Sequence, residues 1–278
     1  MESRPRSFYA LATVFGLFLL FLYGPTITIA ILSFQGPSGG LTFPMQGVSL
    51  HWFRDLFQEQ AVGDIWGSFG RSLMLGLMVM VTTVVVSVMG GLAFRKRFRG
   101  AGLLFQLVVA SLVIPSILVS LGVGLMFSQG GLGVHWATSG FGAQLTWTLP
   151  FGLLIMFAVF NRFDRSYEEA ARDQGASPWQ VLRHVVLPII APSLVGVALF
   201  GFTLSYDEFA RTLLTAGSYN PLPLEIYGMT TNVTTPVIFA LGTLTTVFSF
   251  AVIGVFLLAL RLMQARRARA GCDAGKAL

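Results

Sequence analysis

The chain has 278 residues, of which 54% are hydrophobic and only 11% are charged. Soluble domains carry about 25% charged residues, so this composition excludes a water-exposed globular fold and predicts an integral membrane protein. The net charge is +6, and the single cysteine, Cys272, excludes an intrachain disulfide.

Six apolar stretches are long enough to cross a bilayer, which takes about 20 residues. They predict an all-α integral membrane fold with six transmembrane helices in a single membrane domain, residues 1–278. The predicted spans cover residues 8–34, 72–94, 101–127, 142–160, 189–211 and 236–260. Pro115 and Pro150 lie inside the third and fourth spans, where neighbouring helices re-satisfy the backbone groups that a proline frees. At Pro115 the two interpretations are a kink that lines a pathway and a purely structural bend.

The longest charged stretch follows the fourth span and predicts two short helices separated by a sharp turn. Ser166 with Glu169 three residues later fits a capping box, in which the hydroxyl accepts a backbone N–H and the carboxylate reaches back. Gly175 follows, where a left-handed C-terminal cap favours glycine. We therefore expect a helix over residues 167–174.

A second capping box begins the next helix. Ser177 and Gln180 have the required spacing, and Pro178 stands at the first helical position, where its missing N–H has no effect. We expect this helix over residues 178–186, with Pro188 as its stop signal.

Most of the lysines and arginines lie on alternate connecting segments. The basic residues of these segments are Arg4, Arg6, Arg95, Lys96, Arg97, Arg99, Arg162, Arg165, Arg172, Arg183, Arg261, Arg266, Arg267, Arg269 and Lys276. The positive-inside rule then places both termini and loop 161–188 in the cytoplasm. Because these clusters sit beside helix ends, they are expected to meet anionic membrane lipid and to bind no nucleic acid.

Asp207 and Glu208 are the acidic residues at the end of the fifth predicted span. Charge at membrane depth is unfavourable and usually faces the bundle interior or a water-filled cavity, which would suit a cationic solute. A structural alternative pairs them with Arg211, four residues after Asp207 on one helix face. A position at the membrane interface, where the penalty is small, is a third interpretation.

The sequence contains no recognisable catalytic set. It has no nucleotide-binding loop of the G-x-x-x-x-G-K-[ST] type, no cluster of metal-ligating histidines or cysteines, and no nucleophile elbow. We therefore expect no catalytic residues, no metal site and no cofactor in this chain. If ATP drives the transport, another chain must hydrolyse it.

The charged stretch resembles the EAA loop of ABC importer permeases, with Val185 where that family has isoleucine. The resemblance implies a type I importer permease fold whose loop 161–188, the coupling loop, docks onto a cytoplasmic ATPase. The residues that match the motif and would couple the two chains are Glu169, Ala170, Ala171, Gly175, Leu187 and Pro188.

Other segments resemble the second permease of spermidine/putrescine importers. These segments are 97–100, 204–209, 218–219 and 222–229. The resemblance implies a multi-pass protein of the bacterial inner membrane that imports a polyamine, with Tyr206, Asp207 and Glu208 along the path. It also implies an ATP-binding-cassette ATPase dimer that uses ATP and magnesium, a second permease subunit, and a periplasmic or extracellular solute-binding protein.

Several alternatives remain open at the level of the sequence. Permeases of the same subgroup carry phosphonates, amino-acid derivatives or ferric ion, and a homodimer of this chain could replace the heterodimer. A stand-alone secondary transporter would need several intramembrane charges or inverted halves with interrupted helices, and only Asp207 and Glu208 come close. A membrane enzyme or scaffold is a further alternative, for which no catalytic set is visible in the sequence.

Overall fold

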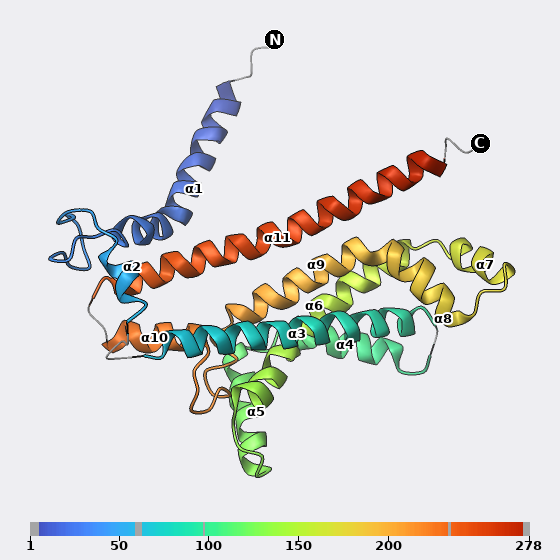
Figure 1. Ribbon diagram of the computed structural model, residues 1–278. Coiled ribbons are helices and arrows are strands. Elements are labelled where there is room, and N and C mark those ends of the chain that lie inside the picture. Colours follow the sequence, from blue (N-terminus) through green and yellow to red (C-terminus); the bar gives the residue numbers. More distant parts are fainter. Residues whose placement is uncertain (1–5, 59–62, 97, 233–234, 275–278) are drawn as a thin grey trace. The chain divides into compact units, whose positions relative to one another are not determined.

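The computed structural model describes residues 6–58, 63–96, 98–232 and 235–274 (Figure 1). Across these ranges the chain forms helices and turns, with no strand beyond one isolated bridge between Gln35 and Val48. The predicted all-α membrane fold is therefore confirmed. Arg4, Arg97 and Lys276, which belong to the predicted basic clusters, lie outside the described residues.

Within the described ranges, five helical stretches are long and apolar enough to cross a membrane. They are Ser7–Leu32 in α1 (Arg6–Leu32), Ile65–Phe94 as α3, Trp136–Arg162 as η1 and α6, Pro178–Tyr206 as α8, η2 and α9, and Val237–Ala265 in α11 (Val237–Ala274). Five of the six predicted spans thus correspond to unbroken helical stretches. The fifth begins earlier than expected, because the helix already starts at Pro178, and it ends at Tyr206.

The remaining predicted span, residues 101–127, has the bend expected near Pro115, but the bend divides it into two helices. It consists of α4 (Ala101–Ser111) and α5 (Ser116–Gln129), which are bent by 108° at a short break. Pro115 stands at the N-cap of α5 with ψ near 130°, outside the helical region. Proline offers no N–H to the preceding turn and also disfavours the helical conformation in the residue before it, so the helix is interrupted here.

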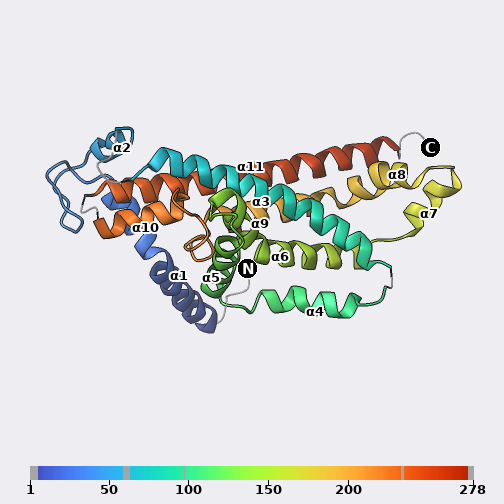
Figure 2. The same cartoon turned by 90° about the horizontal axis from the view of Figure 1, so that it is seen from below.

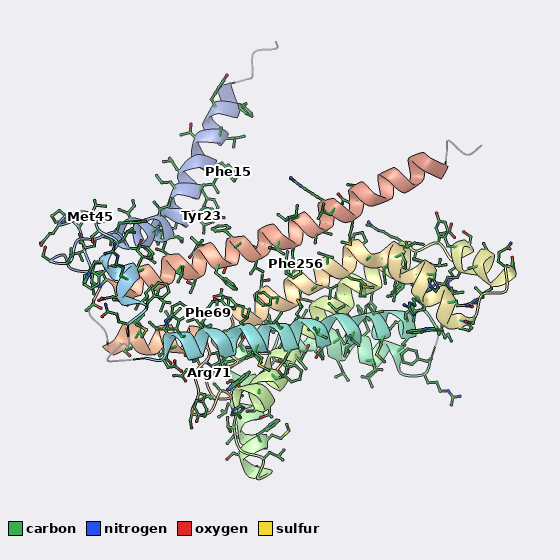
Figure 3. The ribbon with its side chains drawn as sticks, viewed as in Figure 1. Phe15, Tyr23, Met45, Phe69, Arg71 and Phe256 are labelled. Carbon is green, nitrogen blue, oxygen red and sulfur yellow. The ribbon has the colours of Figure 1, made fainter. Side chains whose placement is uncertain are left out.

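Contacts divide the chain into two compact units, and the first contains residues 1–65 and 226–250. It includes α1, α2 (His51–Asp55), the second half of α10 (Leu222–Asn232) and the beginning of α11. The buried side chain of Gln35 organises its loop, since its amide donates to the carbonyl of Gly40 and accepts from the N–H of Gln46 at 2.7 Å. The apolar side chains of α1, including Phe15 and Tyr23, project outward (Figure 3).

The second unit contains residues 66–225 and 251–278 and is built on α6 (Phe141–Arg162) packed along α9 (Leu187–Tyr206). The short helices α7 (Ser166–Asp173), α8 (Pro178–Val181) and η2 (Leu182–Val186) lie at one end of this pair (Figures 1 and 2). The core cluster at this end consists of Met156, Phe160, Val181, Val186, Ile190 and Val197.

Small and polar side chains allow α3, α6 and α9 to approach closely. The hydroxyls of Thr83 and Thr148 lie 3.0 Å apart, and Ser205 bonds the side chain of Gln144. A β-carbon on Gly152 would lie 2.2 Å from the Ser87 hydroxyl oxygen, so this position has no space for a larger residue. Small residues and interhelical hydrogen bonds are the usual means of helix association where apolar burial offers no advantage over lipid.

Candidate functional site

The first helix of the coupling loop begins differently from the prediction. Arg165, in helical conformation, is the N-cap of α7, and no side chain makes a hydrogen bond from that position, so the expected capping box of Ser166 and Glu169 is absent. Asp164 replaces it, because its carboxylate accepts the Ser166 N–H at 2.9 Å. Hydrogen bonds from the Ser166 N–H and hydroxyl hold the pKa of Asp164 below its usual range.

The turn after α7 confirms the predicted glycine cap. Gly175 has φ of +82°. Its N–H donates to the carbonyl of Arg172 at 2.8 Å, and the N–H of Ala176 donates to the carbonyl of Ala171 at 3.1 Å. These two bonds define a Schellman motif. A β-carbon on Gly175 would contact no atom within 4 Å, so the backbone conformation, not lack of space, requires glycine here.

The second capping box is present in full. The Gln180 side chain accepts the Ser177 N–H at 2.8 Å, and the Ser177 hydroxyl accepts the Gln180 N–H at 3.4 Å. Pro178 occupies the first turn of α8, as predicted. The two ends of the turn between α7 and α8 are therefore both fixed by local hydrogen bonds, which gives the hairpin a defined shape.

The helix does not stop at Pro188, so that prediction is wrong. Helical structure continues from α8 through the π-helical turn η2 into α9. A π-helical turn carries one extra residue and shifts the hydrogen-bond register, which lets the helix pass a residue without an N–H. Leu187 packs against the core cluster, whereas Pro188 is exposed.

The coupling hairpin, formed by α7, α8 and the turn between them, has two unlike faces. Ala171 and Ala176 pack against the core cluster, so the inner face rests on α6 and α9. The outer face consists of the exposed residues Glu169, Ala170, Gly175, Tyr167 and Trp179. A shallow hollow of about 330 Å³ adjoins Gly175. Of the predicted coupling residues, three are thus on the outer face and Ala171 is on the inner one.

One contact of this region was missed by sequence reasoning. The guanidinium of Arg95, just after α3, lies 2.5 Å from the carboxylate of Glu168 on α7. Spacing could not reveal a pair separated by 73 residues. In the sequence, Arg95 was one of several basic residues that set the orientation of the chain in the membrane. The EAA motif directed attention to Glu169 and not to its neighbour Glu168.

The acidic pair at the end of α9 separates into two different environments. Because α9 ends at Tyr206, the helix spacing that would pair Asp207 with Arg211 does not apply, but the structural interpretation is confirmed for Glu208. Arg211 instead pairs with Glu208, with Nη1 3.4 Å from its carboxylate, and the two side chains are 4% and 8% exposed.

Further contacts fix Arg211 in place. Its Nη1 donates to the Ser116 hydroxyl at 2.8 Å, and its guanidinium lies 4.6 Å from the centre of the Trp147 ring. The carboxylate of Glu208 also accepts the Arg211 N–H at 2.9 Å. Glu208 therefore has a structural role, because its carboxylate is already paired with Arg211.

Asp207 is exposed, in contrast to its two neighbours. The Tyr206 ring is only 5% exposed and stacks on Phe202 at 5.7 Å between centroids. A contribution of Tyr206 to a solute path stays a prediction that requires movement of α9. Asp207 is the predicted path residue whose charge is accessible in this structure.

The loop after α9 is held firmly by neighbouring helices. The Ser120 hydroxyl on α5 donates to the Arg211 carbonyl and accepts the Leu214 N–H at 3.0 Å. Arg71, near the start of α3, donates to the Asn220 carbonyl at 2.8 Å (Figure 3). Among the residues that the structure describes, no group of three histidines, cysteines or acidic residues could hold a metal ion.

Comparison with known sequences gives the family. Residues 84–270 match the model of the binding-protein-dependent transport system inner membrane component, and the chain belongs to this family. It is 28% identical over 235 residues to the spermidine/putrescine transport system permease protein PotC of Haemophilus influenzae, with 84% of this chain and 89% of the relative covered. It is 28% identical over 232 residues to the putrescine transport system permease protein PotI of Escherichia coli, with 81% of each covered.

Solved structures agree on the fold. A bacterial ABC transporter involved in the import of the acidic polysaccharide alginate superposes with a TM-score of 0.68 at 19% identity, covering 94% of this chain and 99% of that one. A chain of the MetNI methionine ABC transporter gives a TM-score of 0.52 at 18% identity, covering 72% and 94%. The protein is therefore a permease component of a binding-protein-dependent importer and a multi-pass membrane protein.

Proposed function

We propose that this chain is a permease subunit of an ATP-driven polyamine importer in the bacterial inner membrane. Its partners would be a cytoplasmic ATPase dimer that binds ATP and magnesium, a second permease subunit and a solute-binding protein outside the membrane. The observation that carries the proposal is the coupling hairpin, which rests on α6 and α9 and presents Glu169, Ala170 and Gly175 outward.

The architecture of the hairpin supports its role as the docking element. Its outer face bears small residues that allow another chain to approach closely, and both ends of its turn are capped. Because α8, η2 and α9 form one helical stretch, a displacement of the hairpin by the ATPase would pass directly into a membrane-spanning helix. Movements of this kind would open the permease alternately to each side.

A charged side chain in the docking face tests this role. Gly175→Asp should leave the protein in the membrane, since the position is open, and abolish ATP hydrolysis stimulated by the loaded binding protein. Gly133→Asp is the matched control, because Gly133 also has positive φ and open surroundings but lies outside the coupling loop. Retained stimulation in Gly175→Asp, or equal loss in both variants, would count against docking.

The solute is inferred from the relatives and from Asp207. The similar permeases named above belong to spermidine and putrescine systems, and a polyamine carries several positive charges. Glu208 is neutralised by Arg211, whereas the carboxylate of Asp207 is exposed and has the sign that would attract such a solute. An anionic phosphonate would be repelled at the same position.

Uptake of labelled spermidine and putrescine by the complete transporter in vesicles checks this assignment. Asp207→Asn removes the charge with little change of shape, and we expect a loss of uptake with normal amounts of assembled complex. Unlabelled phosphonate should not compete, whereas unlabelled polyamine should. Competition by phosphonate alone would refute the polyamine assignment, and full activity of Asp207→Asn would remove Asp207 from the path.

A further inference from the structure

The end of α3 and the coupling hairpin are joined across a cavity. A space of about 540 Å³ lies between residues 92–96, α7 and the start of the α8 helix. A cavity contributes no packing contacts, so the two elements cannot push on each other through it. Arg95 and Glu168 both line this space and meet at 2.5 Å.

Arg95 is held at its own end by aromatic rings. Its guanidinium lies 5.3 Å from the centre of the Phe160 ring and 5.2 Å from that of Phe163, at the end of α6. Arginine stacks on aromatic faces and forms directed bonds to a carboxylate, so this side chain has little freedom to swing away. The guanidinium of Arg165 donates to the Arg95 carbonyl at 3.1 Å and fixes the backbone as well.

Two arginines contact the Glu168 carboxylate, and they differ in position and exposure. Arg95 reaches it from α3, and the two side chains are 14% and 12% exposed. Arg172 reaches it from within α7, at 3.6 Å, with a side chain that is 59% exposed. Only the first bond connects different elements, and its low exposure shields it from solvent and salt.

We propose that the pair of Arg95 and Glu168 is the link that transmits movement of the coupling hairpin to α3. This role rests on the proposed docking of the ATPase onto the hairpin. Arg95 and Glu168 are positioning residues, because they contact neither nucleotide nor solute. Without the pair, the ATPase would still bind the outer face, but movement of α7 would reach α3 only through the Arg165 bond to the Arg95 backbone and through packing on the core cluster, which makes the coupling weaker.

The experiment separates docking from transmission in the complete transporter. Arg95→Ala and Glu168→Gln should lower both uptake and the ratio of stimulated to basal ATP hydrolysis by about tenfold or more. The amount of ATPase subunit that co-purifies should not change. The double variant should lose no more than either single variant, because both remove the same link. Arg95→Lys, which keeps a charge toward Glu168, should fall between wild type and Arg95→Ala.

Arg172→Ala is the matched control. It removes a cation from the same carboxylate without touching the link between α3 and α7, and exposed pairs of this kind contribute little. We expect less than about a twofold change in the ratio for this variant. Since Glu168→Gln is nearly isosteric, it keeps the test informative if Arg95→Ala does not accumulate in the membrane.

Three results would overturn the proposal. They are unchanged coupling in Glu168→Gln, loss of ATPase binding in that variant, and additive losses in the double variant. These results differ from those expected if the proposed function itself is wrong. In that case the wild-type complex would contain no ATPase subunit or would show no ATP-dependent uptake.

Discussion

The pair of Glu208 and Arg211 offers the sharpest test of the structure, because its neighbour Asp207 serves as an internal control. Removing one partner of a buried ion pair costs about 3–5 kcal/mol, since the other charge is left uncompensated. Arg211 would keep its contacts to Ser116 and Trp147, so we expect the lower end of this range for Glu208→Ala. Asp207→Asn, at an exposed position, should change stability by less than about 0.5 kcal/mol.

Thermal unfolding of the purified protein in detergent measures the difference. A loss of 1 kcal/mol lowers the midpoint by about 2–4 °C in a domain of comparable size, so Glu208→Ala should unfold roughly 10 °C earlier. Adding Arg211→Met to that variant should restore part of the loss, because the buried charge then disappears altogether.

Equal midpoints for Glu208→Ala and wild type would refute the assignment of a stabilising pair. A larger effect from Asp207→Asn than from Glu208→Ala would show that the two acidic residues have exchanged roles. A double variant that is less stable than Glu208→Ala would mean that Arg211 contributes independently of the carboxylate.

Two further predictions concern glycines. A β-carbon on Gly124 would lie 2.6 Å from the Leu214 carbonyl oxygen, so Gly124→Ala should displace the loop after α9. We expect it to lower the free energy of unfolding by about 1–3 kcal/mol, measured by thermal unfolding. Gly122→Ala, on the same helix but in open space, is the control and should have no such effect. At Gly175, asparagine tolerates the left-handed conformation better than alanine, for which it costs about 1–2 kcal/mol. Gly175→Ala should therefore speed hydrogen exchange at the end of α7 more than Gly175→Asn does. The reverse order would contradict the role of Gly175 as a helix cap.

Local patterns predicted local structure well. The box of Ser177 and Gln180 and the cap at Gly175 follow from side chains within a few residues of one another, and both are present. The first box failed because Asp164, two residues before Ser166, offers a stronger acceptor than the hydroxyl. Pro188 failed as a stop signal because the π-helical turn before it changes the register of the helix.

Features that depend on distant contacts could not be read from the sequence. The pairing rule for Asp207 and Arg211 assumed a helix through both, but α9 ends at Tyr206. A bend at Pro115 was predicted from the proline itself, but its angle of 108° and the division of the span into two helices were not. The link from Arg95 to Glu168 joins segments 73 residues apart, which no periodicity encodes.

The meeting of Arg95 and Glu168 also bears on how often the polypeptide traverses the bilayer. Two side chains that touch must lie on the same side of the lipid, so the chain between them traverses it an even number of times. The stretch Trp136–Arg162 supplies one traverse, and the sharply bent α4 and α5 must together supply the other. Added to the remaining long helices, this favours six traverses, the higher of the two counts that helix length and composition allow.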